Sequence, residues 1–139
     1  MSATMMNGGS TQDAYLKGEI RLAAGFGFIS DVIIDTHFDA RGRFARLAQA
    51  LAENPGIVAI GLSEDTGVVV EKGHILRVVG SSVVTLMEGR EILHNNFADI
   101  REGSPLSVGK LGVYLLSHSD VFNLQTREFA PVMFEDHQK

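Results

Sequence analysis

The chain contains no cysteine among its 139 residues. Without a thiol it can form no disulfide bond, no zinc site with thiolate ligands and no cysteine nucleophile. The absence does not by itself indicate a cellular compartment. It narrows the chemistry that the chain can perform to groups other than sulfur.

Long apolar runs and an excess of positive charge are missing as well. No apolar run approaches the ~20 residues that a membrane-spanning helix requires, and Met1 is not followed by the basic segment and apolar core of a signal peptide. The formal net charge is −5, whereas non-specific nucleic-acid binding calls for a basic surface. We therefore predict no membrane partner, no nucleic-acid partner and a cytoplasmic location. The length suits one domain, spanning residues 1–139.

A recognisable nucleophile is the third missing feature. None of the ten serines lies in a Gly-x-Ser-x-Gly motif, which holds a nucleophile on a strained turn. The segment 117–120, Ser-His-Ser-Asp, has the residue types of a catalytic triad, but neighbours on an extended chain point to opposite faces and cannot align as one. His74, His94 and His137 lack partnered spacing and are interpreted as surface residues. We predict neither a metal ion nor another cofactor.

The most informative segment is Ile33–Leu47, which predicts the end of a strand, a polar turn and the start of a helix. Residues 32–34 are β-branched and apolar, as in a buried strand. Asp35 and His37 follow at a spacing of two, so an extended backbone points both side chains to one face. Asp39 is placed to cap the next helix through its carboxylate.

The expected helix spans Arg43–Glu53 and places Phe44, Leu47 and Leu51 in one apolar stripe. Asn-Pro-Gly at 54–56 ends it.

Three arginines, Arg41, Arg43 and Arg46, lie at the beginning of this helix. Cations at a helix N-terminus are unfavourable by roughly 0.3–1 kcal/mol each, because the backbone dipole already places positive charge there. A local cost of this kind is typical of a site for an anionic ligand. The alternative interpretation is a solvated helix face that carries three unrelated arginines.

Further elements follow the helix. Ile57–Leu62 is all apolar apart from one glycine, which predicts a strand buried on both faces and completes a strand–helix–strand unit. Thr66–Glu71 and His74–Val79 flank Lys72-Gly73 and predict a hairpin. Val83–Met87 and Gly112–Leu116 are expected strands.

The N-terminal region is less regular. Residues 1–9 are interpreted as the last turns of a helix that ends at a glycine cap. Leu22–Ile29 is apolar and interrupted by glycines, which predicts a buried loop or a short strand.

A family resemblance rests on two of these segments. Asp-Thr-His-Phe at 35–38, followed by Arg-Gly-Arg-x-x-Arg-Leu at 41–47, resembles the catalytic-histidine segment of cyanophycinase, in a serine-peptidase family that also contains peptidase E. Gly61–Val70, Gly-Leu-Ser-Glu-Asp-Thr-Gly-Val-Val-Val, is similar to the Gly-Ile-Asp-Glu-x-Thr-Ala stretch of that family. The resemblance covers most of the chain.

The resemblance implies roles for particular residues. His37 would be the general base, and Asp13 would be the carboxylate that orients it, with Glu19 as the alternative. The implied substrate-binding residues are Asp35, Thr36, Arg41, Arg43 and Arg46. Thr36 departs from the glutamine expected in this family, which leaves open whether the peptide is cyanophycin or another β-linked aspartyl peptide.

The implied fold is α/β, the C-terminal part of a three-layer α/β/α sandwich similar to class I glutamine amidotransferases, with β-hairpin additions. The implied activity is serine-type exopeptidase cleavage of cyanophycin to β-aspartyl-arginine dipeptides, by a homodimer. The chain would then start a few residues after the catalytic serine and would be inactive alone. The alternative function is a non-catalytic module that binds anionic or arginine-bearing peptides.

Overall fold

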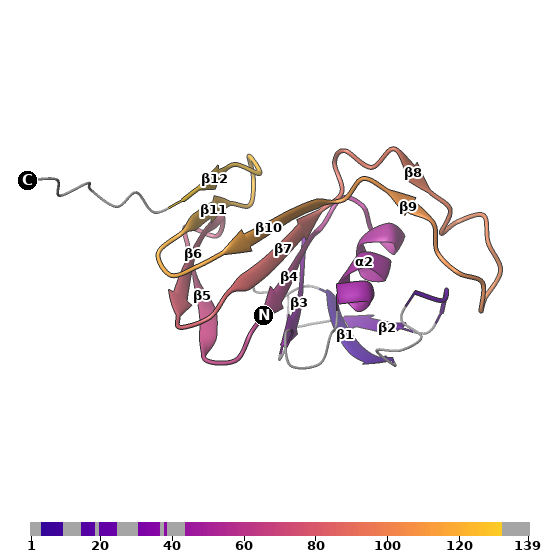
Figure 1. Cartoon of the computed structure of the whole chain (residues 1–139), viewed down its shortest axis with the longest axis horizontal. Helices are drawn as coiled ribbons and strands as arrows, with labels where there is room; N and C mark the ends of the chain where they lie inside the picture. The colour runs from indigo at the N-terminus through magenta and orange to yellow at the C-terminus, as the bar shows by residue number, and fades with distance from the viewer. Residues whose placement is uncertain are drawn as a thin grey trace, which may run out of the picture.

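Figure 1 shows the computed structural model of the chain, which describes residues 4–9, 15–18, 20–24, 31–36, 38 and 44–131. The architecture combines several small β-sheets with helix α2 (Phe44–Glu53). The predicted α/β class is confirmed at this level. Within the described ranges, no helix is long and apolar enough to cross a membrane.

A four-stranded sheet in the order β10-β7-β4-β3 lies at the centre (Figure 1). Its strands are β3 (Val32–Thr36), β4 (Val58–Leu62), β7 (Val84–Glu88) and β10 (Gly112–Leu116). β3 and β4 are parallel and α2 connects them, so the predicted strand–helix–strand unit is confirmed. β7 pairs antiparallel with both β4 and β10. Parallel strands need a crossover, whereas these antiparallel neighbours do not.

Helix α2 covers one face of the central sheet. Its Leu47 and Leu51 are fully buried against Ile33 of β3 and Met87 of β7. Burial of each such side chain contributes about 1.5–3 kcal/mol, which holds the helix on the sheet. Phe44, which the sequence placed in the same stripe, is exposed instead. It is the first residue of the helix, so its side chain lies beyond the part of α2 that contacts the sheet.

A second sheet, in the order β12-β11-β6-β5, packs on the opposite face. Its strands are β5 (Thr66–Glu71), β6 (Ile75–Gly80), β11 (Val121–Asn123) and β12 (Phe129–Ala130). Leu76 and Phe122 of this sheet form one buried cluster with Ile60 and Leu86 of the central sheet. The described layers are therefore α2, the central sheet and the second sheet. Where the resembled sandwich predicts helices on this face, the described residues place β-structure.

The predicted hairpin is confirmed as β5 and β6. Lys72 and Gly73 both have positive φ, 52° and 76°, and the His74 N–H donates to the Glu71 carbonyl at 3.1 Å. This geometry is the tight turn that matches the twist of two antiparallel strands. The ladder begins with Glu71 opposite Ile75, so His74 lies just outside it.

The remaining elements are two short antiparallel pairs. β8 (His94–Asn95) pairs with β9 (Val108–Gly109), and β1 (Thr4–Gly9) pairs with β2 (Ile20–Ala24). The helix end predicted for residues 1–9 is therefore wrong over the described residues 4–9, because pairing with β2 satisfies their backbone groups in an extended conformation. β2 makes residues 22–24 of the predicted segment Leu22–Ile29 a strand, which begins two residues earlier, and residues 25–29 lie outside the described parts of the chain.

Candidate functional site

The candidate site lies where the parallel strands β3 and β4 end. Asp35 of β3 is directly opposite Gly61 of β4, and the same row continues through Thr85 of β7 and Leu115 of β10. The carboxyl ends of parallel strands are where α/β proteins place ligands. The two segments that carry the family resemblance are therefore neighbours in the sheet, although more than ten residues of helix and turn separate them in the chain.

Asp35 and Arg46 form a buried ion pair at this end of the sheet. Arg46 Nε is 3.7 Å from Asp35 Oδ2, and the two residues are only 7% and 4% exposed. A buried carboxylate close to a guanidinium offsets part of the cost of removing both charges from water. Arg46 occupies the third position of α2, where the helix dipole disfavours a cation. Asp35 supplies the negative charge that makes this position tolerable.

The solvated-face interpretation is therefore wrong for Arg46, which is buried, while its predicted role in substrate binding stays a prediction. Thr36, the next residue along β3, is exposed at the end of the strand.

Phe38 and Gly61 make a close contact that the sequence analysis did not single out. A Cβ atom added to Gly61 would lie 2.5 Å from the Phe38 ring, a distance that side chains do not tolerate. Phe38 is buried at 5% exposure and belongs to the core beneath α2. Glycine at position 61 thus creates the space for the ring that follows His37 directly in sequence. The only sequence signal was a glycine inside an apolar strand, which is typical of a close approach to another group.

Several predicted residues lie outside the described parts of the chain. They are His37, Asp13, Glu19, Asp39, Arg41 and Arg43. Their predicted roles as base, orienting carboxylate, helix cap and substrate ligands stay predictions.

The Ser117–Asp120 segment forms a compact turn. Asp120 Oδ2 accepts hydrogen bonds from the backbone N–H and the hydroxyl of Ser117, at 2.8 and 3.2 Å. His118 Nδ1 accepts from the Gly80 N–H at 3.3 Å, on a different strand. A carboxylate that bonds its own turn is typical of a local structural role.

No group of three or more His, Asp or Glu side chains within the described ranges is placed to hold a metal ion. Of the histidines interpreted as surface residues, His94 is exposed, His74 is half-buried and His137 lies outside the described residues. His74 Nδ1 lies 2.9 Å from the Lys72 carbonyl oxygen, inside the β5–β6 turn.

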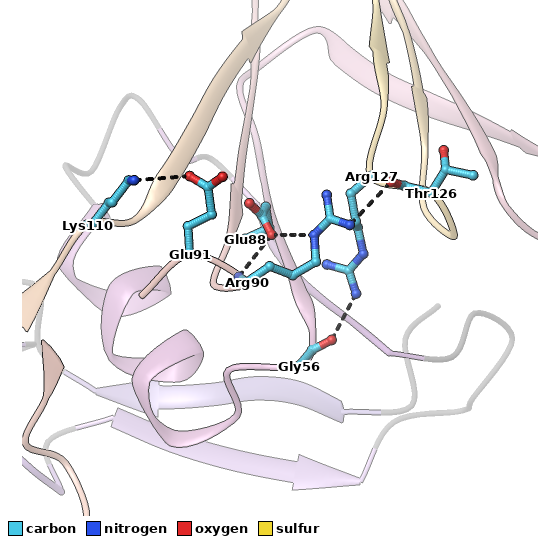
Figure 2. A network of polar contacts seen from close by, with 7 residues as sticks. All are labelled: Gly56, Glu88, Arg90, Glu91, Lys110, Thr126 and Arg127. Carbon is cyan, nitrogen blue, oxygen red and sulfur yellow. Dashed lines mark hydrogen bonds and ion pairs between the residues drawn. The ribbon is translucent and has the colours of Figure 1, made fainter. Parts of the chain in front are cut away.

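A second polar network lies at the other end of the central sheet (Figure 2). Glu88, buried at the end of β7, accepts hydrogen bonds from the Arg90 backbone N–H at 3.0 Å and from Arg90 Nε at 3.2 Å. Arg90 Nη1 donates to the Thr126 carbonyl at 3.3 Å, and Arg127 Nη2 donates to the Gly56 carbonyl at 2.9 Å. These bonds join the β11–β12 turn to the central sheet. No periodicity in the sequence links positions so far apart.

The comparisons with known proteins agree on one group of relatives, although no family model matches the chain. A cyanophycinase of Synechococcus elongatus is 35% identical over 124 residues, covering 89% of this chain and 38% of the relative. The cyanophycinase of Geminocystis herdmanii is 34% identical over 128 residues, 92% of this chain and 47% of the relative. The cyanophycinase of Trichormus variabilis is 35% identical over 133 residues, which cover 96% of this chain and 45% of the relative.

The fold and the site thus define an α/β protein with polar residues at the carboxyl ends of two parallel strands. In sequence, the chain is similar to cyanophycinases over about nine-tenths of its length. It spans 38–47% of the length of these curated relatives. The resemblance drawn from the Asp-Thr-His-Phe and Gly61–Val70 segments is confirmed.

Proposed function

We propose that this chain carries the histidine-bearing part of a serine-type peptidase that hydrolyses cyanophycin to β-aspartyl-arginine dipeptides. The observation that carries the proposal is the similarity of about 35% to cyanophycinases along 89–96% of the chain. The adjacency of β3 and β4 supports it, because it joins the two segments of the motif at one sheet edge.

In this proposal, His37 takes the proton from a serine hydroxyl as that hydroxyl attacks the scissile carbonyl, and then gives the proton to the leaving amine. Asp13, or Glu19 as the alternative, accepts a hydrogen bond from the other ring nitrogen and thereby selects the histidine tautomer. The residues before and after position 37 are both anchored. Asp35, in the strand before it, pairs with Arg46, and Phe38, directly after it, packs against Gly61.

Substrate binding would use groups of both charges. Cyanophycin has an aspartate backbone with arginine joined to each side-chain carboxylate, so its repeat presents carboxylates and guanidinium groups together. Arg41 and Arg43 would pair with carboxylates in the two-point geometry of a guanidinium. Thr36 would contribute a hydroxyl from its exposed position on β3. Asp35 would face a substrate guanidinium, with Arg46 setting its orientation.

The whole enzyme would have the three-layer α/β/α sandwich similar to class I glutamine amidotransferases and would act as a homodimer. The central sheet and α2 described here would then be one edge of that larger sandwich, with the second β-sheet as an addition.

We expect the 139-residue chain alone to have no peptidase activity, because the printed sequence shows no cysteine and no serine in an elbow motif. The test is to assay β-aspartyl-arginine release by the chain alone and by a chimera. The chimera joins the chain to the part of the Synechococcus elongatus cyanophycinase that the match does not cover. Release by the chimera, abolished by His37→Ala, is the expected result. If the chain alone released the dipeptide, and His37→Ala abolished that release, the expected inactivity of the isolated chain would be contradicted.

The missing elbow motif favours a second candidate, a non-catalytic module for anionic or arginine-bearing peptides. A chimera that binds cyanophycin but never cleaves it would support this module and would overturn the peptidase proposal.

A further inference from the structure

A pocket lies at the end of β3 opposite the candidate site. It has a volume of about 300 Å³. It lies where the start of β3 meets the β5–β6 turn and the turn that follows β11. Asp31, His74 and Arg127 are the titratable residues that line it. From Val32 to Thr36 the strand spans about 13 Å, at about 3.3 Å per residue. The pocket is therefore separate from the proposed peptidase site.

Arg127 brings to this pocket a positive charge that the described residues neutralise incompletely. No described carboxylate lies within ion-pair distance of Arg127. Its Nη2 donates to the neutral Gly56 carbonyl, and its Nη1, an atom buried from solvent, has no hydrogen-bond partner among those residues. Glu88, the buried acid of the network in Figure 2, is already engaged by Arg90. Burial, and then the like charge of Arg90, lower the pKa of Arg127, while Glu88 and Asp31 oppose this shift. An anionic group in the pocket would relieve this imbalance.

Asp31 brings the opposite charge. It is exposed, lies directly before β3 with a φ of 58°, and has no cation within ion-pair distance among the described residues. Asp31 and Arg127 line the same pocket, and the Asp31 charge acts to raise the pKa of Arg127, yet the two groups form no ion pair with each other. Val32 and Leu124 add apolar lining to the same pocket. A single site thus presents one cation and one anion across a partly apolar surface.

We propose that this pocket binds an amino acid-sized zwitterion, whose carboxylate pairs with Arg127 and whose cationic group pairs with Asp31. The volume lies at the lower end of the range of ligand pockets, roughly 300–1,000 Å³, which suits a molecule of one or two residues. A free amino acid and the end of a short peptide offer the same two groups. The inference does not depend on the proposed peptidase activity, because every residue it uses lies at the opposite end of β3.

The test is calorimetric titration of the 139-residue chain with L-arginine, with agmatine and with glycyl-L-arginine. Agmatine keeps the guanidinium but lacks the carboxylate, so it loses the contact with Arg127. We expect L-arginine to bind with a Kd on the order of 1 mM or lower. Agmatine should bind at least about tenfold more weakly, because it loses one charge-assisted hydrogen bond. Whichever of L-arginine and the dipeptide binds more tightly identifies the preferred form.

Asp31→Asn is the informative variant, because asparagine tolerates the left-handed backbone of this position and only the charge changes. It should weaken L-arginine binding about tenfold, with an unchanged circular dichroism spectrum. Arg127→Gln should weaken it at least as much. Asp99→Asn, an exposed acid in the loop after β8, is the matched control and should leave the Kd unchanged. Equal binding of agmatine and L-arginine, an unaffected Asp31→Asn variant or undetectable L-arginine binding would each overturn the proposal.

Discussion

An arginine lies near each end of β3, and the two arginines have different partners. At the carboxyl end, Arg46 is buried and lies 3.7 Å from the Asp35 carboxylate. At the amino end, Arg127 donates to a neutral carbonyl, and its pKa is lowered by burial and by Arg90. Arg46 comes from α2, the helix that follows β3 in the chain, whereas Arg127 comes from the distant turn between β11 and β12. Arg46 therefore has a carboxylate partner that offsets its burial, whereas the half-buried Arg127 has only a neutral carbonyl as its hydrogen-bond acceptor among the described residues.

The proposed function places catalysis at the carboxyl end of β3 and not at the amino end. In the chimera with a cyanophycinase, His37→Ala should lower kcat by about 10³-fold or more, because members of a catalytic triad act as a unit. Asp31→Asn, at the amino end, is the control and should leave kcat unchanged. The measurement is the rate of β-aspartyl-arginine release at saturating cyanophycin. A kcat of the His37→Ala chimera close to that of its parent would remove His37 from the mechanism.

The buried ion pair predicts a large loss of stability when one partner is removed. Asp35→Asn should lower the free energy of unfolding by about 3 kcal/mol, because a buried guanidinium then loses the carboxylate it contacts. The exposed Lys110–Glu91 pair, with Nζ and Oε2 3.5 Å apart, provides the matched control. Glu91→Gln should cost less than about 1 kcal/mol, since solvent screens both charges.

Urea unfolding of the two variants measures this difference directly. If Asp35→Asn cost no more than Glu91→Gln, the Asp35–Arg46 pair would contribute no more than a surface contact.

The close approach of Phe38 predicts a smaller effect at the same end of the sheet. Gly61→Ala should cost about 1–3 kcal/mol, because the added methyl group overlaps the buried ring and one of them must move. Gly67→Ala is the matched control on β5, where an added Cβ atom meets nothing within 4 Å. We expect that change to be neutral or slightly stabilising, because alanine restricts the unfolded chain more than glycine does.

The double variant Gly61→Ala with Phe38→Leu sharpens the argument, since a smaller side chain at position 38 should recover part of the loss. Additive costs in the double variant would show that Gly61 and Phe38 do not compete for the same space.

The arginines of the helix start give the smallest effects. Arg41→Lys and Arg43→Lys should each lower kcat/KM of the chimera, by an amount that corresponds to about 1 kcal/mol of activation free energy. The reason is that lysine keeps the charge but loses two-point pairing with a carboxylate. Arg46→Lys should also lower the melting temperature, because Arg46 is buried against Asp35. The measurements are steady-state kinetics and thermal unfolding. Full activity of the Arg41→Lys and Arg43→Lys variants would exclude these two arginines from substrate binding.

Local sequence patterns predicted much of the fold, because strand, turn and helix-end preferences depend on residues that are neighbours in the chain. The apolar run before Asp35, the breaker at residues 54–56 and the Lys72-Gly73 turn each constrain the backbone within a few residues. β3, β4, the β5–β6 hairpin and β10 were accordingly placed to within one or two residues. The error at residues 1–9 arose where no strong local signal exists. The pairing that makes β1 a strand comes from residues 20–24, beyond the reach of a periodicity argument.

By itself, the sequence determined the strand–helix–strand unit, the placement of Asp35 at a strand end, the absence of thiol chemistry and the similarity to cyanophycinases. Only the tertiary structure decided that Arg46 faces Asp35, that Gly61 makes space for Phe38 and that Arg127 reaches the pocket beside Asp31. The reason is physical. Helix caps, turns and apolar periodicity act between neighbours in the chain, whereas a charge finds its partner, or lacks one, only after distant segments have packed together.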